Sequence, residues 1–258
     1  MTPILAFDIE TVPDIAGLRL LHGIEAQISD SDVAEFAFRE RRARTGHDFL
    51  PLHQHRVVAI ACALRDEESF RCWSLGSAEE SEAVLIRRFF DGIEKYTPQL
   101  VSWNGGGFDL PVLHYRSLVH GVSAPRYWEQ GDEDRDFRYN NYIARYHMRH
   151  VDLMDVLPLY QNRGQAPLNE MARLLGFPGK LGLDGSRVWE AYQAGEIESI
   201  RNYCATDAAN TYLVFQRFQL IRGQCDEEQY RKELQLVRET FAKSGEEHWR
   251  EFVGRWSQ

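Results

Sequence analysis

The chain has 258 residues, of which 43% are hydrophobic and 12% aromatic, so it can build a substantial core and is not a disordered polymer. Its 30 basic and 39 acidic residues give a net charge of −9, which argues against a protein that coats nucleic acid by charge alone but not against an enzyme whose carboxylates hold cations. No apolar run reaches the roughly 18 residues of a membrane span, and the four scattered cysteines fit a reducing compartment, so we expect a cytoplasmic protein without a membrane segment.

The first hundred residues predict short strands interrupted by one insertion. Apolar runs bounded by acids or turn residues are typical of buried strands. The segment 14–50, between the first two runs, predicts a partly helical insertion. A turn at 66–68 joins the second and third runs as a hairpin. The predicted strands lie at residues 3–7, 57–64, 70–73 and 100–103.

Helical periodicity dominates the remainder of the chain. The capping-box pair Ser77 and Glu80 predicts the start of one helix, whose apolar positions run from 85 to 93. Alternating strands and helices without a linker predict one α/β domain over 1–258, with a core at about 3–220. Further helices are expected at residues 109–121, 168–175, 197–215 and in a charged tail over about 227–258.

The first candidate motif, FDIET at residues 7–11, ends the first predicted strand. Side chains alternate along a strand, so Asp8 and Glu10 share one face. Two carboxylates placed together repel each other unless a cation lies between them or one of them is protonated. The alternative is a polar strand end. Two other D-x-E pairs, at 66–68 and 226–228, are interpreted as solvated turns or helix ends.

The second motif, WNGGGFD at residues 103–109, follows another strand and opens a helix. Asp109 has two interpretations, either as a helix N-cap or as a side chain at the carboxyl end of a strand, where open α/β sheets place their sites. The three glycines permit close approach of the backbone to a ligand.

The third motif, YCATD at residues 203–207, lies within the long predicted helix. A spacing of four places Tyr203 and Asp207 on one helix face, one turn apart. The alternative is a partly buried tyrosine beside an exposed aspartate.

Together, the three motifs resemble those of the DEDD superfamily of 3′–5′ exonucleases, and the tyrosine four residues before the last aspartate resembles its DEDDy branch. The chain is similar to stand-alone exonucleases related to the exonuclease domain of family B DNA polymerases, over about residues 3–220. The resemblance implies a ribonuclease H-like α/β fold, with a mixed sheet flanked by helices. It also implies 3′–5′ hydrolysis of single-stranded DNA. RNA 3′-end trimming and a non-catalytic binding module remain alternatives.

The resemblance also implies a catalytic site with two Mg²⁺ or Mn²⁺ ions. Asp8 is expected to contact both ions, Glu10 and Asp207 the ion beside the attacking water, and Asp109 the other ion. Because a phenol with a pKa near 10 is a poor base, Tyr203 is expected to orient the water. The residues expected to bind the DNA 3′ end are Thr11, Asn104, Phe108 and Lys180.

Residues 138–150 (RYNNYIARYHMRH) interleave basic and aromatic side chains and contain no acid. This composition suits single-stranded nucleic acid, although a charge run is more commonly a solvated face.

Overall fold

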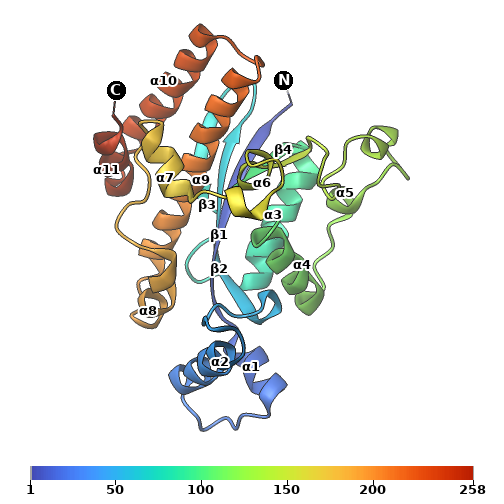
Figure 1. Cartoon of the computed structure of the whole chain (residues 1–258), viewed down its shortest axis with the longest axis vertical. Helices are drawn as coiled ribbons and strands as arrows, with labels where there is room; N and C mark the ends of the chain where they lie inside the picture. The colour runs from blue at the N-terminus through green and yellow to red at the C-terminus, as the bar shows by residue number, and fades with distance from the viewer. Residues whose placement is uncertain (1, 258) are drawn as a thin grey trace.

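A five-stranded mixed sheet forms the centre of the computed structural model, which describes residues 2–257 (Figure 1). The strand order is β3-β2-β1-β4-β5. Strand β1 pairs antiparallel with β2 and parallel with β4, so the sheet is mixed, as predicted. The strands are β1 (Ile4–Pro13), β2 (His55–Arg65), β3 (Phe70–Ser74), β4 (Gln99–Ser102) and β5 (His150–Asp152).

Helices cover both faces of this sheet, with α3 and α4 on one side and α7, α9 and α10 on the other (Figure 1). Within residues 2–257, no helix has both the length and the apolar character needed to cross a membrane. The helices are α1 (Ile15–His22), α2 (Asp30–Thr45), α3 (Glu82–Tyr96), α4 (Asp109–His120), α5 (Pro125–Trp128), α6 (Leu153–Val156), α7 (Leu168–Leu174), α8 (Val188–Gln193), α9 (Ile197–Ile221), α10 (Glu227–Ser244) and α11 (Glu247–Arg255).

Strand β1 separates two hydrophobic clusters. Its odd-numbered residues in the range 5–9 belong to the cluster that contains α3 and α4. Its residues Ala6 and Val12 belong to the cluster that contains α9. Because alternate side chains of a strand point to opposite faces, Asp8 and Glu10 lie on the face that α9 covers.

Small side chains bring α9 close to this face of the sheet. The residues of β2 that pair with Asp8 and Glu10 are Ala61 and Ala59. Helix α9 contributes further small, buried residues to the same cluster, among them Ala205 and Ala208. Since no bulky group separates the two layers at this point, a short carboxylate on α9 can reach the carboxylates of β1.

A β-bulge lies directly beside the acidic end of β1. The pairing between β1 and β2 shifts between Glu10 and Thr11, so that Val58 is the extra residue of β2. Both Val58 and Ala59 consequently join the α9 cluster. A bulge bends the strand that carries the extra residue and re-aims its side chains, so β2 bends opposite the acidic end of β1.

The predicted insertion forms a helical lobe that projects beyond one end of the sheet (Figure 1). Helices α1 and α2 enclose a small cluster of their own around Leu18 and Val33. Asp14, at the base of the lobe, pairs with the buried Arg116 of α4, whose guanidinium also contacts both carboxylate oxygens of Glu82. This buried ion network ties the end of β1 to α3 and α4.

The charged tail folds into α10 and α11, which pack on the α9 side of the sheet. Phe241 and Trp249 stack with ring centroids 3.9 Å apart and are both buried.

The predicted start of α3 is wrong by several residues. Ser81 is its N-cap residue, and Ser77 N instead donates to Glu80 Oε2 at 3.2 Å in the preceding turn. The capping-box pair therefore stabilises a turn rather than the helix.

Candidate active site

Three carboxylates converge where α9 crosses β1. Oxygens of Asp8, Glu10 and Asp207 lie within 4.8 Å of one another. Asp207 is buried, and its Oδ1 has no hydrogen-bond partner within residues 2–257. A buried carboxylate oxygen without a donor is costly, and a cation would satisfy it. The donors are all hard oxygens, which Mg²⁺ and Mn²⁺ prefer.

The two other D-x-E pairs have structural roles away from this cluster. Asp66 Oδ1 accepts hydrogen bonds from Glu68 N and Ser69 N in the β2–β3 turn. Asp226 caps the N-terminus of α10. Both interpretations drawn from the sequence are confirmed.

Asp109 reaches β1 from the first residue of α4. Strand β4 pairs with β1 only as far as Ala6, so the N–H of Ile9 lies beyond its hydrogen-bonding reach. That N–H donates instead to Asp109 Oδ1 at 3.1 Å. Asp109 lies outside the 4.8 Å group, but its side chain is directed to the strand between Asp8 and Glu10. It does not cap α4, whose N-cap residue is Phe108.

Without a bound cation, the four carboxyl groups have pKa values above those of ordinary acids. Burial raises the pKa of Asp109 to about 7 and that of Asp207 to about 6. Burial, followed by the neighbouring carboxylates, raises the pKa values of Asp8 and Glu10 well above their ordinary range. Four acids in this state favour a bound divalent ion over separate ionisation.

Tyr203 lies one helical turn before Asp207 and is buried. Burial and the carboxylates of Asp207, Glu10 and Asp8 raise the pKa of its phenol, which therefore stays protonated. The hydroxyl can donate a hydrogen bond but cannot serve as a base. Lys180 Nζ lies 5.3 Å from the centre of the Tyr203 ring.

The loop that carries Lys180 is fastened to α9. Gly179 N donates to Asn210 Oδ1 at 3.1 Å, and Asn210 Nδ2 donates to Gly179 O at 2.9 Å. Lys180 N donates to Asn169 Oδ1. Burial raises the pKa values of Glu10 and Asp207, and the positive charge of Lys180 offsets part of that rise. Asn210 was not predicted, because its partner is the backbone of Gly179, which lies 31 residues earlier in the chain.

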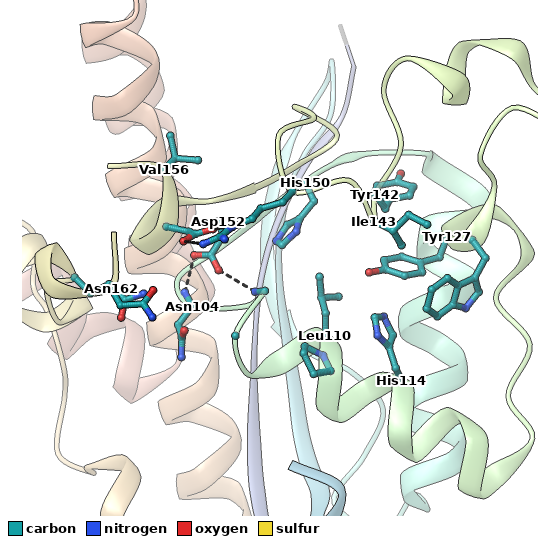
Figure 2. A pocket seen from close by; sticks show the side chains of 17 residues that line it. Asn104, Leu110, His114, Tyr127, Tyr142, Ile143, His150, Asp152, Val156 and Asn162 are labelled. Carbon is teal, nitrogen blue, oxygen red and sulfur yellow. Dashed lines mark hydrogen bonds and ion pairs between the residues drawn. The ribbon is translucent and has the colours of Figure 1, made fainter. Parts of the chain in front are cut away.

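Asp152, which was also not predicted, shapes the glycine loop that leads to Asp109 (Figure 2). Its two carboxylate oxygens accept from Asn104 N and Gly106 N, each at 2.8 Å. These bonds hold Asn104 in a left-handed conformation, with φ of 68°, which asparagine tolerates better than most residues. No apolar run marks this position in the sequence, because Asp152 ends a three-residue strand that begins at His150.

Gly105 has no room for a side chain. A Cβ at this position would lie 2.4 Å from both Cβ and Oγ of Ser102. We expect Gly105→Ala to displace the loop, lower the melting temperature by several degrees and reduce nuclease activity, because overpacking costs about 1–3 kcal/mol. Thermal unfolding and a cleavage assay check this. Gly92→Ala is the matched control, since a Cβ there has no neighbour within 4 Å; equal behaviour of the two variants would contradict the prediction.

Thr11 and Phe108 lie together around His55. Thr11 Oγ1 is 2.8 Å from His55 Nδ1. The Phe108 ring is 5.3 Å from the His55 ring and 5.6 Å from Phe49. Phe49, from the end of the insertion, is half exposed. Sequence reasoning missed Phe49 and His55, which no motif marks. Binding of substrate by this group stays a prediction.

Residues 47–256 match a protein family described as "Predicted 3'-5' exonuclease related to the exonuclease domain of PolB". The chain belongs to this family. The match includes Asp109, Tyr203 and Asp207, whereas Asp8 and Glu10 precede it. The sequence motifs implied an α/β fold with a mixed sheet flanked by helices, and the structure of this chain confirms it.

A second comparison is much more local. The chain is 42% identical over 45 residues to the catalytic polypeptide of DNA polymerase epsilon from Saccharomyces cerevisiae. These residues are 17% of this chain and 2% of the polymerase polypeptide, so the chain spans only a small part of that relative. Membership of a PolB-related exonuclease family implies a nuclease, and hence a nucleic acid substrate.

Proposed function

We propose that the protein is a metal-dependent 3′–5′ exonuclease that removes nucleotides from the 3′ end of single-stranded DNA. The convergence of Asp8, Glu10 and Asp207 within 4.8 Å, beside a protonated Tyr203, is the observation that carries this proposal. The family match supports the same reaction class. In cells, we infer a cytoplasmic location from the sequence alone.

The donors of this site are hard oxygens that suit divalent ions, and we infer that the site holds two of them. Asp8, Glu10 and Asp207 form one group, and Asp109 is held against the strand that carries Asp8 and Glu10. Asp8 would contribute to holding both ions, Glu10 and Asp207 would hold one, and Asp109 would hold the other. When bound, such ions activate the attacking water and stabilise charge on the leaving oxygen.

The chain's own residues then supply orientation. Tyr203 keeps its proton and directs a hydrogen bond at the attacking water. Lys180, whose charge already acts on Glu10 and Asp207, is placed to meet a phosphate oxygen. Thr11 and Phe108 would contact the terminal nucleotide, and a base can stack on the Phe108 ring.

A 5′-labelled single strand incubated with Mg²⁺ or Mn²⁺ tests the proposal. We expect a ladder of products shortened from the 3′ end. A matched RNA strand tests the substrate class, because discrimination of the 2′-hydroxyl depends on fine geometry. A circular single strand should remain uncut. Absence of a ladder, with a control nuclease active in the same buffer, would favour a binding module instead.

Replacing Tyr203 with phenylalanine removes the hydroxyl and keeps the ring. We expect cleavage to fall about 100-fold, because a misoriented nucleophile costs a factor of this size. Mn²⁺ affinity should change little, since the phenol is not a metal ligand in this arrangement. Tyr115→Phe is the control, because Tyr115 is exposed and lies outside the three motifs and the segment 138–150. Unchanged cleavage by Tyr203→Phe would remove the tyrosine from the mechanism.

A further inference from the structure

The glycine loop of the candidate active site also forms one wall of a cavity of about 710 Å³ (Figure 2). Asn104, Gly106 and Gly107 belong to this wall. None of the four acids of the active site lines the cavity, and neither does Tyr203. The cavity is therefore a separate compartment that begins two residues before Asp109. Its volume lies within the range of about 300–1,000 Å³ that is usual for small-ligand sites.

Aromatic side chains form the opposite wall (Figure 2). Tyr127 and Trp128 come from α5, and Tyr142 comes from the basic and aromatic segment 138–150. Tyr127 and Tyr142 are stacked with an interplanar angle of 9°, and the Tyr142 hydroxyl donates to Pro98 O at 2.7 Å. Trp128 remains 47% exposed. The cavity thus presents an exposed indole on a rigid aromatic support.

Neutral polar groups around the cavity lack partners. His114, whose ring lies 4.7 Å from that of Trp128, has a buried Nε2 without a hydrogen-bond partner within residues 2–257. Burial lowers the pKa of His114 to about 4, so the ring is neutral near pH 7. The side-chain amides of Asn104, Asn162 and Gln165 also line the cavity, and within the described residues no hydrogen bond engages them.

The charged groups of the cavity are already paired. Arg145 is the one arginine or lysine among the described lining residues, and it binds Asp155 through two hydrogen bonds of 2.7 and 2.6 Å. Asp152 is occupied by backbone N–H groups, and His150 Nε2 lies 2.8 Å from Ser102 Oγ. A phosphate would find no free cation here. A flat, uncharged ligand with a hydrogen-bonding edge would find a ring and several free partners.

We propose that this cavity binds a nucleobase, and that in the working enzyme the base comes from the substrate strand upstream of the scissile bond. The strand assignment rests on the proposed function; base binding by itself does not. Consecutive Cα atoms lie 3.8 Å apart, so a wall that ends at Gly107 is within about 8 Å of Asp109. The cavity therefore lies within reach of the first few nucleotides behind the 3′ end.

Oligonucleotides with one abasic residue at successive positions from the 3′ end test the strand assignment. Binding is measured by fluorescence anisotropy in the Asp8→Asn background, so that cleavage does not interfere. We expect one internal position to weaken binding about tenfold, a size typical of lost base–aromatic stacking. In Trp128→Ala, the same abasic substitution should cost nothing further, because the two changes remove one interaction.

Two additional variants protect the test from a folding artefact. Trp73→Ala removes another half-exposed tryptophan, on β3 and outside the cavity, and should retain the full abasic penalty. His114→Phe keeps an aromatic ring and removes the free ring nitrogen. We expect it to weaken binding to the normal oligonucleotide severalfold while leaving thermal stability nearly unchanged.

Binding of free deoxyadenosine monophosphate tests whether the bound base belongs to a free nucleotide or to the substrate strand. Quenching of tryptophan fluorescence that disappears in Trp128→Phe, without any abasic effect, would support base binding and assign it to a free nucleotide. If neither the abasic series nor the nucleotide responds to Trp128, the base site is refuted, whatever the nuclease assay shows. Conversely, Trp128-dependent binding without cleavage in the wild-type protein would refute the proposed function and leave the base site standing.

Discussion

Asp8→Asn is expected to reduce cleavage at least about 1,000-fold, because it removes the carboxylate inferred to contact both ions. Metal ions contribute several kcal/mol to the stabilisation of transition-state charge, and each 1.36 kcal/mol changes the rate tenfold. The side chains have nearly equal volumes, so the fold should persist. Rates on a 5′-labelled strand at saturating Mn²⁺ measure the effect.

The same substitution should stabilise the metal-free protein. Burial and the nearby carboxylates make the ionised form of Asp8 unfavourable in the folded state, as its raised pKa indicates. A neutral amide removes that repulsion, so we expect the melting temperature in chelator at pH 8 to rise by a few degrees. Loss of activity together with a gain in stability is the signature of a strained functional site.

Asp226→Asn is the matched control for both effects. Asp226 begins a D-x-E pair as Asp8 does, but it caps α10 at the surface, and asparagine caps helices equally well. We expect wild-type cleavage and stability from this variant. Substantial cleavage by Asp8→Asn, or a lower melting temperature without metal, would refute the assignment of Asp8.

Local patterns in the sequence were sufficient to predict where the motifs lie. Alternation placed Asp8 and Glu10 on one face of a strand, and helical spacing placed Tyr203 one turn before Asp207. The arrangement of α9 against β1 is instead a tertiary property. It depends on alanines in two distant segments, such as Ala61 and Ala205, that only the fold brings together.

The supporting side chains could not be predicted, because their partners are backbone groups of other segments. The role of Asp152 follows only from the hydrogen bonds that it accepts from Asn104 N and Gly106 N. The role of Asn210 follows only from its hydrogen bond with the backbone of Gly179. No spacing rule links residues so far apart in the chain. Asp109 shows the same limit, since the bond from Ile9 N to its carboxylate depends on the early end of the β1–β4 pairing, which no sequence pattern marks.

Without metal, the acidic cluster should destabilise the protein more as the pH rises. Asp109 and Asp207 have pKa values of about 7 and about 6 in the folded state, against an ordinary value of 3.8. Between about pH 4 and pH 7, the folded state therefore holds protons that the unfolded state has lost. Since stability falls with pH wherever the folded state binds more protons, the melting temperature in chelator should fall across this window relative to that of Asp207→Asn. This comparison cancels the opposite contribution of buried histidines such as His114, whose pKa burial lowers to about 4.

Mn²⁺ should reverse this trend, because it replaces the protons that the cluster holds at low pH. Metal binding to carboxylates releases protons, so affinity and the ligand-induced rise in melting temperature should both be greater at pH 8 than at pH 6. Calorimetry in two buffers of different ionisation enthalpy would measure the protons released. Asp207→Asn should flatten both the pH dependence and the Mn²⁺ response. A difference in melting temperature between the metal-free wild type and Asp207→Asn that stays constant from pH 4 to pH 7, with an equal Mn²⁺ effect at pH 6 and pH 8, would contradict the interpretation of a buried acidic cluster that a cation neutralises.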